Sequence, residues 1–164
     1  MFSVKERSPH SHKTNSENNL RIALVNPRSE SYTRILLTLG LLYIAAVLEK
    51  DGFKVRIFDL YPDDDRDCPS LIAFDPHIVG MSILTDYAPR AQHVSKTISK
   101  ELPQSVFITK GVHVTALPEG SNEGFNADFA VTGEGEDVML DICRKISKGR
   151  DIDLKKRRLD RAPP

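Results

Sequence analysis

The sequence predicts an α/β domain in which short buried strands alternate with helices. Two observations lead to this prediction. Apolar, β-prone runs of five or six residues recur five times between residues 20 and 132. Helical patterns, with apolar residues at spacings of three and four, stand between these runs. Because strands that alternate with helices form right-handed crossover units, the pattern predicts a parallel sheet with helices on both faces.

Each predicted strand is short and mostly apolar. The first is expected to end at Asn26-Pro27, since proline interrupts a strand. The second alternates apolar with charged residues, which is typical of a strand with one wetter face. The strands are expected at residues 20–25, 54–59, 77–82, 105–109 and 128–132. Five strands in this alternation fit a flavodoxin-like (Rossmann-like) doubly wound sheet with the order 2-1-3-4-5.

The predicted helices differ in how much of their surface is apolar. Residues 39–50 are apolar nearly all round, so we expect this helix to be deeply buried and to end before Gly52. The helix at 88–100 has one buried face, and the helix at 136–147 carries a buried stripe. Residues 70–74 are expected to form one helical turn.

Composition limits the class of protein. Lys plus Arg and Asp plus Glu number 23 each, which argues against a nucleic-acid footprint. No apolar run reaches the roughly 18 residues of a membrane span. Two isolated cysteines fit a reducing cytoplasm. We expect a disordered polar leader at 1–19, one folded domain at 20–149, and a charged linker or tail at 150–164.

The fold predicts where a ligand binds. In such sheets the ligand lies beyond the carboxyl ends of the strands, at the switch in strand order. The loops that meet there begin at Asn26, Ser82, Lys110 and Gly133. The chain has no phosphate-cradling Gly-Lys-Ser/Thr loop and no Gly-x-Ser-x-Gly elbow. Asp59 ends the second strand, where we expect it to cap a loop. From pattern alone, capped turns without a ligand fit these loops as well as a binding site does.

Several of these segments together resemble the cobalamin-binding domain of cobalamin-dependent radical SAM proteins. The resemblance covers residues 20–149 and is carried by three runs, 39–49, 111–119 and 133–136. Residues 82–85, Ser-Ile-Leu-Thr, resemble the Ser-x-Leu element of cobalamin domains, whose serine approaches the buried nucleotide tail. Lys110-Gly111 stands where a Gly-Gly pair is usual. The lysine side chain either crowds the tail channel, or swings out and bonds the tail.

The resemblance implies cobalamin bound base-off, with its own base detached from cobalt. Many cobalamin domains carry Asp-x-His-x-x-Gly after the first strand, and its histidine ligates cobalt; this loop has no histidine. His113 is the one histidine on the ligand edge, and we expect it to line the pocket or fix a loop. No residue is expected to act as a catalyst or a metal ligand. The cofactor-binding residues predicted are Asn26, Pro27, Leu39, Gly40, Ser82, Leu84, Thr85, Lys110, Gly111, His113, Thr115, Gly133, Glu134 and Gly135.

In the resembled family, cobalt carries a methyl group from S-adenosylmethionine to a substrate radical. A second domain there binds an iron–sulfur cluster through three closely spaced cysteines, which this chain lacks. Alone, the chain is therefore not expected to cleave S-adenosylmethionine. Its expected partners are cobalamin and a radical SAM domain in cis or in trans, with no membrane or nucleic acid. Two alternatives stay open: a cofactor-free interaction or regulatory domain on the same fold, and a flavin-binding module.

Overall fold

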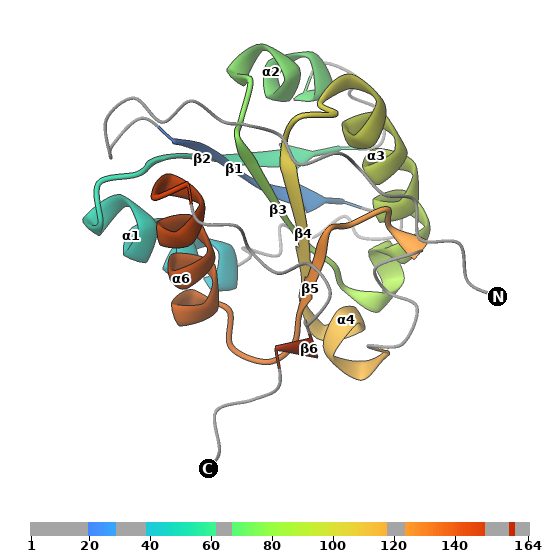
Figure 1. Cartoon of the computed structure of the whole chain (residues 1–164). Helices are drawn as coiled ribbons and strands as arrows, with labels where there is room; N and C mark the ends of the chain where they lie inside the picture. The colour runs from blue at the N-terminus through green and yellow to red at the C-terminus, as the bar shows by residue number, and fades with distance from the viewer. Residues whose placement is uncertain (1–19, 29–38, 62–66, 118–123, 150–157, 160–164) are drawn as a thin grey trace, which may run out of the picture.

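A six-stranded sheet, with helices on both faces, forms the frame of the molecule (Figure 1). The structure is a computed structural model that describes residues 20–28, 39–61, 67–117, 124–149 and 158–159. The expected leader at 1–19, and the expected tail at 150–164 apart from residues 158–159, lie outside the described residues.

All strand pairs are parallel, and the strand order is β2-β1-β3-β4-β5-β6. The strands are β1 (Arg21–Pro27), β2 (Lys54–Leu60), β3 (Ile78–Ser82), β4 (Val106–Lys110), β5 (Phe129–Val131) and β6 (Arg158–Leu159). The predicted flavodoxin-like order 2-1-3-4-5 is therefore confirmed for the first five strands. The two-residue β6 was not predicted, because two residues in a charged segment carry no apolar pattern.

The end of β1 differs from the prediction. This strand continues through Pro27, which lies opposite Leu60 of β2. Proline is compatible with this place because its fixed φ suits extended backbone and it stands at the last position of the strand. The next residue supplies the amide instead: Arg28 N donates to Leu60 O at 2.9 Å. The strand thus carries Asn26 and Pro27 to the carboxyl edge of the sheet.

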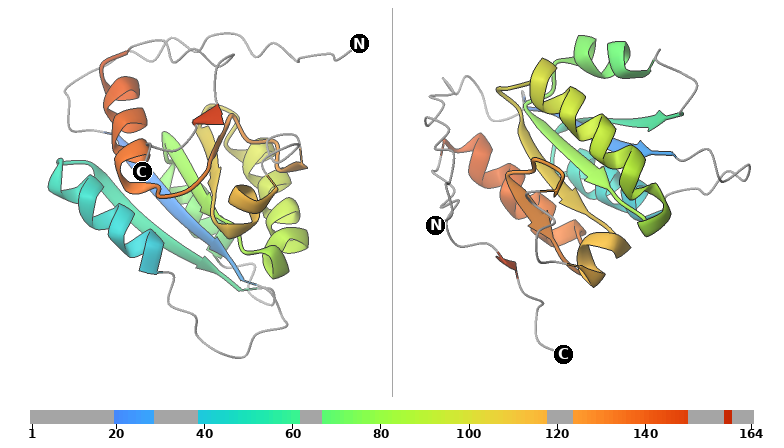
Figure 2. Two further views of the ribbon diagram at one scale, coloured as in Figure 1. Left: turned by 90° about the horizontal axis from the view of Figure 1, so that it is seen from below. Right: turned by 90° about the vertical axis from the view of Figure 1, so that its right-hand side faces the viewer.

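The helices form two layers (Figures 1 and 2). Helices α1 and α6 cover one face of the sheet, and α2 and α3 cover the other. Alternating residues of β1 follow this division: Ile22 and Leu24 pack toward α1 and α6, whereas Ala23 and Val25 pack toward α3. The helices are α1 (Leu39–Lys50), α2 (Asp67–Phe74), the 3₁₀ turn η1 (Thr85–Tyr87), α3 (Ala88–Glu101), α4 (Val112–Ala116) and α6 (Glu136–Ser147).

The prediction that residues 39–50 are deeply buried is wrong. The side chains of Leu39, Leu42 and Tyr43 are 58%, 46% and 63% exposed. The buried face of α1 consists of Leu41, Ile44, Ala45 and Leu48. The helix packs on the sheet and against α6, so the described part of the chain covers only one side of it. The helix ends as predicted, with Gly52 at φ 91°.

The remaining helical differences concern short segments. Helix α2 begins at Asp67 and is longer than the single turn predicted. Neither η1 nor α4 was predicted, since each is shorter than two helical turns. Among the described residues, no helix combines the length and the apolar character that crossing a membrane requires.

Candidate functional site

The carboxyl ends of the strands bring several predicted site residues to one edge of the sheet. Ser82 at the end of β3 lies opposite Lys110 at the end of β4. Beyond them, Gly133 N donates to Thr115 Oγ1 at 3.1 Å, which ties α4 to the loop after β5. Asn26 is the second-last residue of β1, the strand that pairs with β3. Parallel pairing alone produces this convergence, because all carboxyl ends point the same way.

Gly111 holds the loops after β3 and β4 against each other. Its φ is 114°, and a Cβ atom there would lie 2.5 Å from Ile83 O and 2.8 Å from Ile83 N. Two hydrogen bonds accompany this approach: Ile83 N donates to Lys110 O at 2.7 Å, and His113 N donates to Ile83 O at 3.1 Å. Only glycine fits both the dihedral angle and the contact. Gly111 therefore fixes the backbone from which the Lys110 side chain departs.

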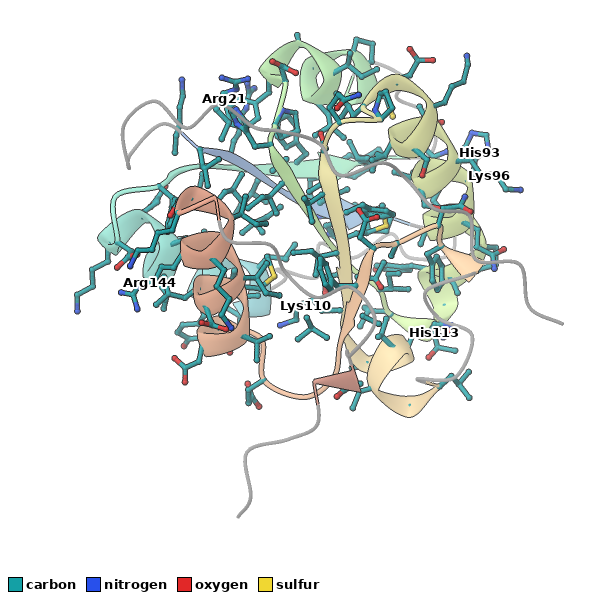
Figure 3. The ribbon with its side chains drawn as sticks, viewed as in Figure 1. Arg21, His93, Lys96, Lys110, His113 and Arg144 are labelled. Carbon is teal, nitrogen blue, oxygen red and sulfur yellow. The ribbon has the colours of Figure 1, made fainter. Side chains whose placement is uncertain are left out.

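Lys110 extends into the space between the beginnings of α1 and α6 (Figure 3). A Cβ atom on Gly135, which precedes α6, would lie 2.5 Å from Lys110 Nζ. A Cβ atom on Gly40, in the first turn of α1, would lie 3.9 Å from the same Nζ. Burial lowers the pKa of the Lys110 ammonium from its usual value, and the charges of Glu136 and Glu134 oppose that change. The Lys110 side chain therefore lies between Gly40 and Gly135, and the space that this side chain occupies between α1 and α6 is called the passage.

His113 lies on the other side of the sheet from the Lys110 ammonium (Figure 3). Its ring packs edge-on against Phe125, with the ring centroids 5.8 Å apart. Phe125 belongs to the core beneath α3, whereas Gly40 lies in the first turn of α1 and Gly135 precedes α6. His113 Nδ1 is buried without a hydrogen-bond partner. The structure therefore does not bring His113 together with Lys110, Gly40 and Gly135.

A buried polar cluster at the ends of β1 and β2 was missed by the sequence analysis. Asn26 Nδ2 donates to Asp59 Oδ1 at 2.6 Å, and Arg28 pairs with Asp59 Oδ2 at 2.5 Å. The Arg28 guanidinium also lies 4.6 Å from the centre of the Tyr61 ring. The hydrogen bond with Asp59 holds the pKa of Arg28 above its usual value, although burial opposes it. Asn26 and Asp59 are register partners in the structure, which the predicted strand order alone does not specify.

The remaining predicted residues lie around these features with differing exposure. Ser82 and Leu84 are half-buried, and Thr85 and Glu134 are exposed. Large apolar side chains are exposed in the same region, on the segments that follow β1, β2 and β4. These are Leu39, Leu42, Tyr43, Tyr61, Val112 and Leu117. Three of them, Leu39, Leu42 and Tyr43, lie together at the beginning of α1, and an apolar patch of this kind marks a surface for a ligand or a partner.

Comparison with known proteins identifies the family of the chain. A family model described as "B12 binding domain" matches residues 30–142. The chain belongs to the B12-binding domain family. The fold agrees, because this B12-binding domain superimposes on a radical S-adenosylmethionine methyltransferase, TsrM of Kitasatospora setae, whose structure holds cobalamin and a 4Fe–4S cluster. That match has a TM-score of 0.71 and 21% identity, and it covers 80% of this chain and 25% of that one.

Two similar proteins are methyltransferases by name. An uncharacterised methyltransferase of Pyrococcus horikoshii is 35% identical over 143 residues, which cover 81% of this chain and 31% of that protein. Cytidylyl-2-hydroxyethylphosphonate methyltransferase of Streptomyces wedmorensis is 29% identical over 145 residues, covering 73% of this chain and 27% of that protein. This B12-binding domain thus spans less than a third of either relative. It is a cobalamin-binding domain related to radical SAM methyltransferases.

The described residues at the edge are compatible with a cobalamin tail. Glycines line both sides of the passage between α1 and α6, where a Cβ atom on either would approach the end of the Lys110 side chain. A side chain of this kind is flexible, since its four-carbon stem has several rotatable bonds. At Gly133 a Cβ atom would meet nothing within 4 Å. The passage therefore offers small residues and one flexible cation, and this combination fits a long ligand that carries amides and a phosphate.

Proposed function

We propose that this chain holds cobalamin base-off, with the nucleotide tail in the passage between α1 and α6, for a radical SAM methyltransferase reaction. The observation that carries the proposal is that the Lys110 ammonium lies between two glycines, Gly40 and Gly135, at the carboxyl edge of the sheet. Gly40 and Gly135 would flank the tail, and Ser82 and Gly111 would border the strand ends beneath the corrin.

The absence of a protein nitrogen from cobalt is supported by how the nitrogens near the edge are engaged. Asn26 Nδ2 is bonded to Asp59, and Arg28 is held by the same carboxylate. His113 packs against Phe125 on the side of α3. A guanidinium remains protonated and offers no lone pair to a metal. Asn26 and Arg28 would have to break their contacts with Asp59 to approach cobalt, and the His113 ring lies on the side of α3.

The exposed apolar side chains support the binding of a wide, flat ligand. Leu39, Leu42 and Tyr43 from α1 and Val112 from α4 are exposed large hydrophobic residues at or near the ends of the strands that flank the passage. A flat corrin resting there would remove part of this surface from water. When bound, cobalamin supplies a cobalt that accepts and donates a methyl group. The protein's contribution is to hold the tail, orient the ring and leave one face of the ring open.

The reaction itself requires parts that this chain does not carry. The sequence holds two cysteines, Cys68 and Cys143, so it lacks the three that bind an iron–sulfur cluster in radical SAM proteins. The relatives named as methyltransferases are more than three times as long as the segment they share with this chain. We therefore assign the radical SAM domain to another part of the protein, in cis or in trans, and the substrate contacts to that domain.

A variant that blocks the passage tests the proposal. Gly135 has φ −105°, which other residues adopt, and the atoms nearest to an added Cβ would belong to the flexible Lys110 side chain. Gly135→Leu is therefore expected to fold, but to exclude the tail. The parent is expected to keep a visible corrin spectrum after mixing with hydroxocobalamin and desalting, and Gly135→Leu to lose it. The matched control is Gly124→Leu, which lies away from the passage beside Gln92 and should behave as the parent.

Three results would count against the proposal. A parent that retains no corrinoid would favour the cofactor-free interaction domain. A folded Gly135→Leu that binds as well as the parent would place the tail elsewhere. Equal losses of corrinoid binding in Gly135→Leu and Gly124→Leu would show that the effect is not local to the passage. Circular dichroism of each variant separates loss of binding from loss of fold.

A further inference from the structure

We infer that Lys110 is a specificity residue that pairs with the phosphate of the nucleotide tail, so that the site selects complete corrinoids over corrinoids that lack the tail. The inference rests on the proposed function, because it needs the tail to enter the passage between α1 and α6. It also decides between crowding and bonding, the two roles that the sequence leaves open for this lysine.

The position of the ammonium is the first support. Lys110 Nζ lies close to Gly135 at one wall of the passage and near Gly40 at the other. A tail that enters between these glycines must therefore meet the lysine. The Lys110 side chain is unbranched and flexible, and the two neighbouring residues are glycines, which have no side chain to hold it in place.

The second support is the lack of a direct counter-charge. No ion pair within 4.0 Å joins Lys110 to any acid in the described part of the chain, although the side chain is half-buried. Glu134 and Glu136 act on it only from a distance, and burial outweighs their effect on its pKa. A partly desolvated cation without a partner gains when an anion comes into contact with it.

The acidic side chains near α6 do not reverse this expectation. Glu134 is exposed, and Glu136 is half-exposed, so water and salt screen both. A phosphate in contact with the ammonium is screened much less, because the pair would be enclosed between two helices. In the described part of the chain, no side chain caps the N-terminal end of α6 at Gly135. The attraction between the Lys110 ammonium and a phosphate in contact with it therefore outweighs the repulsion between that phosphate and the two glutamates.

Cobalamin chemistry identifies the anion. Its peripheral acid groups are amides, and the phosphodiester of the nucleotide loop carries the only negative charge at the periphery. Cobinamide has the same corrin ring but ends before this phosphate and before the base. A cation placed in the tail passage can therefore distinguish the two molecules without touching the corrin ring.

The experiment measures the affinity of the parent and two variants for hydroxocobalamin and for cobinamide by visible titration. Lys110→Met keeps the bulk of the side chain and removes its charge. It is expected to lower cobalamin affinity about tenfold, as loss of a charge-assisted hydrogen bond does. Cobinamide affinity should not change. Lys110→Gly should also lower the ratio of cobalamin to cobinamide affinity, and raising the salt concentration should weaken only the parent's preference. Lys100→Met, an exposed lysine of α3, is the control and should match the parent.

Each other outcome overturns the inference in a recognisable way. An unchanged ratio in Lys110→Met would show that charge is irrelevant. A ratio that rises in Lys110→Gly would show that the lysine merely crowds the tail. A parent that binds neither corrinoid would contradict the proposed function as well. Cobinamide binding by the parent without any preference for cobalamin would refute the inference about Lys110 and leave the corrin site intact.

Discussion

Replacing Gly111 with alanine tests the backbone contact on which the site depends. The residue has φ 114° and ψ −178°, a region that side-chain-bearing residues avoid at a cost of about 1–3 kcal/mol. A Cβ atom would also lie 2.5 Å from Ile83 O, so the loops must separate. Separation weakens the hydrogen bonds of Ile83 N and His113 N, each worth about 1 kcal/mol. We expect Gly111→Ala to reduce the free energy of unfolding by about 3 kcal/mol.

Gly133→Ala is the matched control, because its glycine also has a positive φ but no neighbour. Its φ is 73°, and an added Cβ atom would meet nothing within 4 Å. Left-handed strain alone predicts a loss of about 1 kcal/mol. The entropy that alanine removes from the unfolded chain is the same in both variants and cancels in the comparison. Urea unfolding followed by circular dichroism measures both values. Equal stability of the two variants would refute the claim that Ile83 and Gly111 are in forced contact.

Four further predictions concern other parts of the molecule. Asp59→Ala leaves the buried Arg28 guanidinium without its partner, and urea unfolding should show a loss of about 2 kcal/mol; a neutral result would contradict the pairing. Burial raises the pKa of Cys143 to about 12, so in a Cys68→Ser background a thiol reagent at pH 8 should react only as fast as the chain unfolds. The pKa of this thiol is near 9 in the unfolded chain and about 12 in the folded one. The free energy of unfolding should therefore fall as the pH rises between those values. His113→Ala should leave the visible spectrum of bound cobalamin unchanged, since its ring packs against Phe125; a shifted spectrum would place it near cobalt.

Much of the fold could be predicted because strand and helix patterns are local. The order 2-1-3-4-5 follows from strand–helix alternation, and Gly52 ends α1 as expected. The exposure of α1 could not be predicted, because it depends on how much of the helix other elements cover. Periodicity reports which residues are apolar, whereas Leu42 and Tyr43 are apolar and still exposed. Apolar residues on an uncovered face are consistent with a surface reserved for binding.

The site could be predicted only to the level of loops. The switch-point rule brings Ser82, Lys110 and Gly111 to one edge, as the parallel register does in the structure. It does not determine which side of the sheet each side chain faces. Lys110 and His113 are three residues apart, yet the turn at Gly111 sends them to opposite faces. The pairing of Asp59 with Arg28 also depends on a side-chain direction that no sequence pattern reports.

Spin resonance of the cobalt(II) form of bound cobalamin tests the central claim most directly. The parent is loaded with cobalamin, desalted and reduced to the cobalt(II) state. We predict that the corrinoid is retained and that its spectrum shows cobalt hyperfine lines without splitting from an axial nitrogen. The reason is that base-off binding detaches the cofactor's own base and no protein nitrogen is expected to replace it. Nitrogen splitting in the spectrum of the bound corrinoid would contradict base-off binding, and the absence of any retained cobalt would contradict the assignment of the site.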